Sequence, residues 1–487
     1  KLICVEYLYQ EQLTPPINAA FGITSHIKSG LANPQPQLNN FINLVTRNSL
    51  LLAPKMTLKN MLNGANNLQI PFYPIDDSSG LFSYGQGKNS IFFNFSSSHS
   101  DSHIGGLLQA DKTKTNMFLK IMGFPTTEQK TAKSLQNCYE AADILGFPVV
   151  IKPLAESQGR GITANIRHHE QIEEAYKVAS KNSTDSVIVE KFIEGDVHRT
   201  TVANGALAVD GGIACTYPPF VVGNGKNNIS ELIKIENERR DTPDKDELTT
   251  DKIKLDETMM KNLLLIGMNE NSIPERSSRI NLLHTSNAAS GGKVKLVPRK
   301  DIHPDNLKMT IDVTRLFKLN CSGIDFITPD ISRSWREVGA ILEVNSHPGV
   351  GETLAEGILQ GHFSDKNNGR IDSTLIITNN DKFAEQVTQT RKADGVKVGF
   401  ADLSISTIEG EVKRTAQDEL YNNCCSILLH PDCEKIVVSM TSDMVVEFGM
   451  PIDYFDHCVI DPACKNHANI KVVTEFLQKH VGQITNI

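Results

Sequence analysis

Three oxygen-bearing side chains fall on two apolar segments that are typical of β-strands. Asp325 lies within Ser322–Phe326, and Glu343 and Asn345 end the segment Ala340–Asn345. Because Glu343 and Asn345 are two residues apart, they share one face of a strand. Carboxylate and amide oxygens are the ligands that Mg²⁺ prefers when it bridges to phosphates. A single buried acid would favour a satisfied polar group, but three such residues on neighbouring apolar strands favour a cation site.

A lysine stands at the end of another apolar segment, Val149–Pro153. Burial of Lys152 costs desolvation free energy unless an anion meets it. Gly159-Arg160-Gly161 follows closely, and a Gly-x-Gly backbone can approach a polyphosphate because glycine lacks a Cβ. A lone Gly-x-Gly is weak evidence, since any hairpin can carry one. Its place after a lysine-ended strand strengthens the phosphate interpretation.

The surrounding pattern predicts the elements that position these side chains. We predict helices over 111–121, 131–145 and 170–180, and the first of them closes at Gly123, a natural helix stop. Apolar segments predict strands at 149–153, 186–190 and 200–203. Glu190 ends the second of these strands, and Gly195 bends the chain after it. Asn204-Gly205 is a strong signal for a tight hairpin.

Length and composition indicate a multidomain globular protein. The chain has 487 residues, which is enough for about three domains. Composition divides it into a polar zone at 1–110, a zone at 111–355 that alternates apolar and helical patterns, and a third zone at 356–487 that opens with a Gly-bearing joint. The middle zone is typical of α/β or α+β structure. The charged stretch 234–261 is either a solvated helical face or a mobile lid.

Charge and hydropathy exclude several classes of protein. Lys plus Arg total 49 and Asp plus Glu total 57, so the net charge is −8, which argues against a nucleic-acid binder. No apolar run approaches the roughly 20 residues that a membrane span needs, and no secretory signal pattern is visible. Nine cysteines without a Cys-x-x-Cys pair favour buried free thiols over a zinc site or a disulfide framework. We therefore expect a cytoplasmic protein.

Taken together, these motifs resemble those of an ATP-grasp ligase, and more narrowly those of the cyanophycin synthetase family. The resemblance covers the chain from about residue 70 to its end. It rests on the segments Val150-Ile151-Lys152-Pro153-Leu154, Gly159-Arg160-Gly161, Val189-Glu190-Lys191-Phe192-Ile193, His198-Arg199, Gly323-Ile324-Asp325-Phe326-Ile327 and Glu343-Val344-Asn345-Ser346-His347-Pro348-Gly349.

The resemblance implies a two-step amide ligation, in which ATP activates a carboxylate as an acyl phosphate and an amine displaces phosphate. It implies ATP and Mg²⁺ as cofactors. Residues implied to bind the nucleotide are Lys112, Lys152, Gln158, Gly159, Arg160, Gly161, Glu190, Ile193, Asp196 and His198. Asp325, Glu343 and Asn345 would hold Mg²⁺, while Arg199, Arg160 and Lys152 would be catalytic.

Three positions depart from the family pattern in this middle zone. Val197 stands where an acidic residue is usual before His198-Arg199, and Asp196 could compensate. Leu283 replaces an arginine, and the loop Asn287–Gly292 keeps its glycines but loses a hydroxyl. These changes put the identity of the substrate in doubt more than the ATP site.

The third zone resembles a shortened Mur ligase-like module that has lost its nucleotide site. Where the family has a phosphate-binding Gly-Thr-Asn-Gly-Lys-Thr-Thr loop, this chain has Thr378–Ala384. The glycines are gone, Phe383 replaces the hydroxyl that would hold Mg²⁺, and Asp381 would repel phosphate. We therefore expect this module to be a structural remnant that cannot hydrolyse ATP.

The predicted architecture is an α/β and α+β multidomain chain. It has an N-terminal α+β domain at 1–110, a central ATP-grasp fold at 111–355 and a truncated Mur ligase-like α/β module at 356–487. One ATP site beside a degenerate module is the pattern of the second, shorter type of cyanophycin synthetase, which implies polymerisation of β-aspartyl-arginine dipeptides.

The expected partners are a small dipeptide or amino acid and a growing peptide chain. The resemblance also suggests a homo-oligomer, either a dimer or a tetramer, with no nucleic-acid or membrane partner. Two alternatives stay open. One is an ATP-grasp ligase that makes a different peptide or natural product, and the other is an inactive regulatory protein that only binds nucleotide.

Overall fold

The computed structural model describes most of the chain after residue 55. All structural statements below concern the described residues, which are 56–76, 78–154, 161–181, 183, 186–208, 212–241, 247–249, 251–286, 290–363, 367–392, 395–415 and 419–486. No helix in these ranges is long and apolar enough to cross a membrane.

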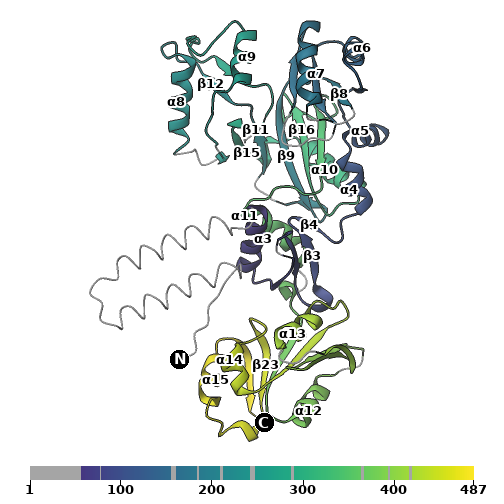
Figure 1. Ribbon diagram of the computed structural model, residues 1–487, viewed down its shortest axis with the longest axis vertical. Coiled ribbons are helices and arrows are strands. Elements are labelled where there is room, and N and C mark those ends of the chain that lie inside the picture. The colour runs from purple at the N-terminus through teal and green to yellow at the C-terminus, as the bar shows by residue number, and fades with distance from the viewer. Residues whose placement is uncertain are drawn as a thin grey trace, which may run out of the picture. The chain divides into compact units, whose positions relative to one another are not determined.

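The chain packs as two compact units, and one is inserted into the sequence of the other. Ser100–Pro348 forms one unit, and the second combines the described residues of Lys1–His99 with those of Gly349–Ile487. Each unit contains both helices and sheets (Figure 1). The α/β and α+β fold class that the sequence predicted is confirmed. The predicted three-domain division remains a prediction.

The inserted unit contains a small antiparallel sheet of order β5-β8-β6-β7. Its strands are β5 (Gln129–Ala132), β8 (Val187–Lys191), β6 (Val149–Pro153) and β7 (Thr163–Ile166), and helices α6 (Leu135–Leu145) and α7 (Ile172–Ser180) lie beside it in Figure 1. Apolar side chains of both helices pack on Val149, Ile151, Val187 and Val189. Lys152 and Glu190 lie on the opposite face of this sheet, because neighbouring residues of a strand point to opposite faces.

A larger antiparallel sheet of the same unit has the order β13-β15-β11-β9-β16-β17. Its strands are β13 (Glu247–Thr249), β15 (Val294–Pro298), β11 (Gly212–Thr216), β9 (Asp196–Ala203), β16 (Cys321–Thr328) and β17 (Ala340–Asn345), and β10 (Ala206–Leu207) pairs with β9. Asn204 and Gly205 have positive φ values of 51° and 76° and form the predicted hairpin turn between β9 and β10.

One face of this large sheet is apolar and carries helices. Ile324, Phe326, Ile341 and Val344 pack with residues of α5 (Lys112–Ile121) and α10 (Pro304–Leu316). Asp111 caps α5 by accepting hydrogen bonds from the backbone of Thr113 and Lys114. The short helix α4 (His103–Ala110) precedes α5. The other face of β9, β16 and β17 is left for polar side chains.

The described helical residues of the charged stretch 234–261 belong to a lobe with its own small core, whereas β13 in the same stretch joins the large sheet. The lobe contains the paired strands β12 (Phe220–Val222) and β14 (Arg279–Asn281), with helices α8 (Ile229–Arg239) and α9 (Glu257–Leu265). In Figure 1 this group stands beyond β11 and β15. Leu232, Met259 and Leu263 are among its buried residues. Its charged side chains also form ion pairs, including Arg239 with Glu236 and Glu247.

The second unit begins with a small α+β part. Helix α3 (Met56–Asn67) precedes an antiparallel sheet of order β1-β2-β3-β4, whose strands are β1 (Phe72–Asp76), β2 (Leu81–Tyr84), β3 (Ile91–Asn94) and β4 (Ser97–Ser98). Helix α11 (Glu352–Phe363) packs on α3, where a Cβ on Gly64 would lie 3.2 Å from the backbone nitrogen of Glu356.

The rest of this unit is built on a sheet of order β21-β20-β19-β22-β18-β23-β24, in which the last five strands are parallel. The strands are β18 (Asp372–Ile377), β19 (Val398–Ala401), β20 (Ile405–Ile408), β21 (Glu411–Thr415), β22 (Lys435–Met440), β23 (Phe455–Ile460) and β24 (Val481–Asn486). The helices are α12 (Asp381–Arg391), α13 (Leu420–Leu428), α14 (Ser442–Phe448) and α15 (Ile470–Leu477).

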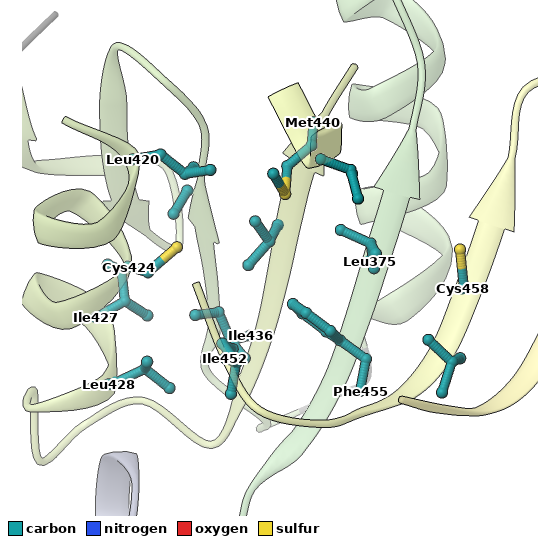
Figure 2. Packing of buried hydrophobic residues seen from close by; sticks show 14 of the residues in the cluster. Leu375, Leu420, Cys424, Ile427, Leu428, Ile436, Met440, Ile452, Phe455 and Cys458 are labelled. Atoms are coloured by element: carbon teal, nitrogen blue, oxygen red, sulfur yellow. The ribbon is translucent and has the colours of Figure 1, made fainter. Parts of the chain in front are cut away.

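Figure 2 shows the core on one face of this sheet. Leu375 of β18, Ile436 of β22, Phe455 of β23 and Ile427 of α13 belong to one buried cluster. Cys424 and Cys458 are also buried here, and burial raises the pKa of the Cys458 thiol to about 12. These thiols therefore pack as small apolar groups.

A turn after β2 joins the α+β part of this unit to the parallel sheet. The buried Gln86 side chain donates to the Tyr73 hydroxyl and accepts from the backbone of Ile371. The backbone of Lys88 donates to the Cys433 carbonyl over 2.8 Å. Gly87 has a φ of +53°, and a Cβ on it would lie 2.1 Å from that carbonyl oxygen. The two parts of the unit therefore fold as one.

Two predicted boundaries are wrong. The strand predicted at 200–203 is part of β9, which begins already at Asp196 and so includes Arg199. The sequence predicted a helix over 131–145, but residues Gln129–Ala132 form β5, and α6 begins only at Leu135 with Ser134 as its cap. Thr131 pairs with Ile188 of β8. Pairing with a buried neighbour at the sheet edge therefore outweighs the local helical pattern.

Candidate nucleotide and metal site

Lys152 and Glu190 lie side by side on adjacent strands of the small sheet. Val150 is directly opposite Glu190 in the β6–β8 register, so Lys152 is two residues further along the same face. The Lys152 Nζ is 2.7 Å from the Glu190 Oε2, and both side chains are less than a tenth exposed. The anion that buried Lys152 requires is therefore supplied by the protein itself.

A small pocket surrounds this pair. It is lined by Lys112, Asn116 and Thr127 beside Lys152 and Glu190, and Ile341 and Leu342 of β17 also line it. Thr127 donates to Glu190 over 3.0 Å, and the Asn116 amide donates to the Thr127 carbonyl over 2.8 Å. The pocket thus brings together residues of the small sheet, α5 and the large sheet.

Charged side chains form a row across three neighbouring strands of the large sheet. Arg199 of β9 lies opposite Asp325 of β16, and Asp325 lies opposite Glu343 of β17. Arg199 donates to both carboxylate oxygens of Asp325, with an Nη2–Oδ2 distance of 2.6 Å. Burial alone would lower the pKa of Arg199, but the charges of Asp325 and Glu343 raise it above its ordinary value.

The next row on the same face contains Gly323 and Asn345, which are paired in register. The Asn345 side chain is half-buried, and its Nδ2 has no hydrogen-bond partner. Lys112 Nζ lies 3.9 Å from a Glu343 oxygen. The sequence prediction that Glu343 and Asn345 share a face and that Asp325 lies on a neighbouring strand is confirmed, and the register adds that Asp325 lies opposite Glu343.

The donor set fits a hard divalent cation. Two carboxylates and an amide oxygen are ligands of the kind that Mg²⁺ takes. The unpartnered Asn345 Nδ2 is a hydrogen-bond donor, so it would take an acceptor such as a phosphate oxygen. Among the described residues no group of three or more His, Cys, Asp or Glu side chains is placed to hold a metal. The candidate site therefore depends on Asn345 and on other oxygen donors such as phosphates.

The comparisons with known proteins point to one family. An ATP-grasp domain model matches residues 117–254. Cyanophycin synthetase from Trichormus variabilis is 29% identical over 421 residues, which cover 82% of this chain and 44% of the relative. Cyanophycin synthetase from Geminocystis herdmanii is 31% identical over 429 residues, which cover 84% of this chain and 48% of the relative. The chain is therefore similar to cyanophycin synthetases over most of its length and contains an ATP-grasp domain.

The chain spans about half the length of these cyanophycin synthetases. Among solved structures, it is similar to a bifunctional glutathione synthetase from Pasteurella multocida, with a TM-score of 0.43 and 20% identity over 66% of this chain and 46% of that one. The central ATP-grasp fold expected from the sequence is confirmed by the family match.

His198 and Asp196 lie away from the charged row. Both have the opposite strand parity to Arg199, so their side chains are on the other face of β9. His198 is buried, its Nδ1 has no hydrogen-bond partner, and burial lowers its pKa. Asp196 lies 3.7 Å from Arg279, and burial raises the pKa of its carboxyl despite that cation. The nucleotide-binding roles suggested for both residues remain predictions.

Other predicted residues are only partly described. Gln158, Gly159 and Arg160 lie outside the described residues, so their roles remain predictions. Gly161 has a φ of +72°, a conformation that favours glycine. Ile193 follows β8 and is half-buried.

Two of the three departures from the cyanophycin synthetase pattern fall on described residues. Val197 is half-buried on β9 and pairs with Thr216 and Ile327. Leu283 is 9% exposed and belongs to the core of the α8–α9 lobe. An arginine at position 283 would place a charge in that core, so the leucine suits the packing of this chain. The third departure, at residues 287–289, lies outside the described residues.

The degenerate loop of the C-terminal module occupies the turn between β18 and α12. Asn380 caps α12 by accepting from the backbone of Lys382, and the Thr378 hydroxyl donates to Asp461 over 2.6 Å. Asp461 is only 5% exposed and follows β23. Carboxyl ends of parallel strands are where α/β folds bind ligands. Here a buried carboxylate lies at that position, which disfavours phosphate.

Sequence reasoning missed two residues of the site region. Thr127 contacts Glu190, but it precedes a strand that was predicted as coil and helix. Arg279 stacks 4.2 Å over the Phe220 ring and meets Asp196. Arg279 lies on the short strand β14 beside Phe220 of β12. Its contact with Phe220 could be recognised only once the pairing of these two strands was known.

Proposed function

We propose that the chain is an ATP-dependent carboxylate–amine ligase that forms amide bonds through an acyl phosphate, with ATP and Mg²⁺ as cofactors. The proposal rests above all on the row of Arg199, Asp325 and Glu343 next to Asn345. Few packing arrangements would place two carboxylates opposite each other without a role for a cation, since like charges in register are destabilising.

The proposed reaction requires no covalent bond between the protein and its substrates. Phosphoryl and acyl transfer of this type depend on positioning and on cancelling negative charge as it develops. Lys112 and Lys152 are proposed to hold phosphates, and Arg160 to cover them. Asp325, Glu343 and Asn345 are proposed to hold Mg²⁺, which supplies charge neutralisation at the transferring phosphoryl group. Arg199 is proposed to support the charge of the reacting groups.

We propose β-aspartyl-arginine dipeptides as the building block, joined into a cyanophycin-like polymer. One observation supports the polymer, and a second supports dipeptide units over alternate addition of single amino acids. The chain is similar to cyanophycin synthetases, and its C-terminal module has Asp381 and a buried Asp461 where a second nucleotide site would need phosphate-binding backbone. A homo-oligomer and a cytoplasmic location belong to the same proposal.

A different peptide product is the second candidate. Val197 and Leu283 depart from the cyanophycin synthetase pattern, and both are described residues of the inserted unit. The third candidate is a nucleotide-binding regulator without catalysis. It is favoured only by the ion pair of Lys152 with Glu190, because this pair engages a lysine that is proposed to bind phosphate.

The first experiment measures ADP release with ATP, Mg²⁺ and candidate substrates. Wild type should release ADP above a Glu343→Ala control. If no amino acid or dipeptide produces this difference, the ligase proposal is wrong and the regulator is favoured.

The second experiment separates the two ligases. β-Aspartyl-arginine is supplied alone, and free aspartate with arginine is supplied in a parallel reaction. Insoluble polymer from the dipeptide alone supports the proposal, whereas product from the free amino acids alone contradicts it. Light scattering on the same sample tests the oligomer, which a monomeric mass would contradict.

A further inference from the structure

We propose that the protein's own cations neutralise the candidate metal site when nucleotide is absent, so that a divalent cation must displace Arg199 from Asp325 to bind. This inference rests on the proposed role of Asp325, Glu343 and Asn345 as a cation site. It assigns Arg199 a function in metal selectivity in addition to any contact with substrate.

The first argument is the balance of charge. Asp325 and Glu343 face each other in register, and such pairs have Cβ atoms about 4.5–5.5 Å apart. Arg199 binds Asp325 through two hydrogen bonds, and Lys112 lies 3.9 Å from Glu343. Two carboxylates therefore have two cationic partners, and little net negative charge remains to attract a free divalent cation.

The second argument is the strength of the Arg199–Asp325 pair. A guanidinium that donates to both oxygens of a carboxylate forms the strong, planar arrangement that a lysine cannot make. Both Asp325 oxygens are occupied in this way. A metal that uses Asp325 as a ligand must share these oxygens with Arg199 or replace one of its hydrogen bonds, and the guanidinium charge on the same carboxylate opposes sharing.

The third argument is that Arg199 can leave. Its side chain is 36% exposed, whereas that of Asp325 is 12% exposed. Gly323 lies beside it, and a Cβ there would be 3.1 Å from the Arg199 Cδ. The absence of that Cβ gives the arginine side chain room on the open side of the sheet. Arg199 can thus move without disturbing the apolar face.

A released guanidinium needs a new anion. The triphosphate is the anion that the proposed function brings to this site, so metal and nucleotide should enter together. Binding of Mn²⁺ alone should be weak in wild type, because each arriving charge must first displace one already present. The row of Arg199, Asp325 and Glu343 therefore couples the binding of the metal to the binding of the nucleotide.

The test measures Mn²⁺ binding to the full chain without nucleotide, by counting free Mn²⁺ from its electron paramagnetic resonance signal. Arg199→Gln removes the competing cation, and we expect it to bind Mn²⁺ about tenfold more tightly than wild type, as a nearby unit charge requires. A gain below about threefold, or a loss, overturns the proposal. Asp325→Asn should abolish the gain when it is combined with Arg199→Gln, and persistence of the gain also overturns it.

Arg315→Gln is the matched control, because it removes one positive charge from an exposed position on α10. It should bind Mn²⁺ like wild type, and an equal gain there would reduce the effect to net charge and overturn the proposal. If Arg199→Gln does not fold, Arg199→Lys replaces it. That variant keeps the charge and loses the planar pair, so it should bind Mn²⁺ more tightly than wild type, and equal or weaker binding overturns the proposal.

These readouts are independent of ligase activity. If Arg199→Gln binds Mn²⁺ more tightly but wild type releases no ADP, the proposed ligase function is rejected and the inference about Arg199 stands. If wild type releases ADP but Arg199→Gln binds Mn²⁺ no more tightly, the ligase function stands and the inference about Arg199 is rejected.

Discussion

Lys152 and Glu190 form an ion pair of 2.7 Å across the β6–β8 register, and both side chains are almost fully buried. The Thr127 hydroxyl donates to the same Glu190 oxygen. A buried pair of this kind is costly to break on one side only, because the remaining charge is left without compensation.

Lys152→Met should therefore reduce the free energy of unfolding by about 3–5 kcal/mol and abolish ADP release. The double variant Lys152→Met with Glu190→Gln should recover most of the stability but none of the activity. Urea unfolding and ADP release measure the two effects. Equal instability of the single and double variants would show that the charge left on Glu190 is not the cause.

Gly87→Ala should destabilise the unit that contains the parallel sheet. The new Cβ would lie 2.1 Å from the Cys433 carbonyl oxygen at a positive φ, so we expect a loss of about 1–3 kcal/mol or more. Gly106→Ala on α4 is the control, since a Cβ there meets no atom within 4 Å and alanine favours helices. Thermal unfolding should rank wild type between the two variants, and a neutral Gly87→Ala would contradict the packing described here.

Lys382→Ala should leave the rate of ADP release unchanged. Lys382 is exposed, and the turn that contains it has Asp381 beside it and Thr378 bonded to buried Asp461. None of these favours a phosphate. Steady-state turnover at saturating ATP measures the effect. A large loss of turnover with an unchanged melting temperature would show that the C-terminal module still has a catalytic function.

Glu236 should make the protein acid-sensitive. Burial works against its charge, but Arg239, Arg240 and Lys293 outweigh it and lower the pKa from 4.5 to about 2. A carboxyl whose pKa is lower in the folded state stabilises the protein above the unfolded pKa. That stability, roughly 3 kcal/mol, is lost as the pH falls from about 5 to 2.

Glu236→Gln should therefore be less stable at neutral pH and show a flatter decline in this window, as measured by urea unfolding at several pH values. Glu238→Gln changes the same charge at an exposed position on the same helix and should behave like wild type. Parallel acid profiles for Glu236→Gln and wild type would exclude this role.

The sequence predicted the elements that carry the site better than the contacts within it. The apolar runs bounded β6 and β17 as the structure has them, because buried strands produce continuous apolar segments; β6 is buried throughout and β17 at half of its residues. Asp325 and Glu343 were also placed on neighbouring strands, although their register was not predicted. Local pattern was sufficient for both.

Strand order was the information that local pattern lacked. Nothing near Lys152 indicated that its partner would be Glu190, and nothing near Arg199 indicated Asp325, 126 residues away. Such pairs depend on register between distant segments, which a single sequence does not specify. The strand β5 was missed for the same reason, since Thr131 is held by Ile188 rather than by its own neighbours.

The inserted unit has a consequence for synthesis on the ribosome. The partner of the Gln86 side chain, Ile371, is synthesised 285 residues later, and the partner of Lys88, Glu434, is synthesised 346 residues later. At translation rates of about 5–20 residues per second, this delay is on the order of tens of seconds. During that time the β1–β4 sheet lacks the parallel-sheet part of its unit, to which Gln86 and Lys88 bond, whereas Ser100–Pro348 can already fold. The nascent chain therefore exposes that surface early, at the stage when a chaperone would be most needed.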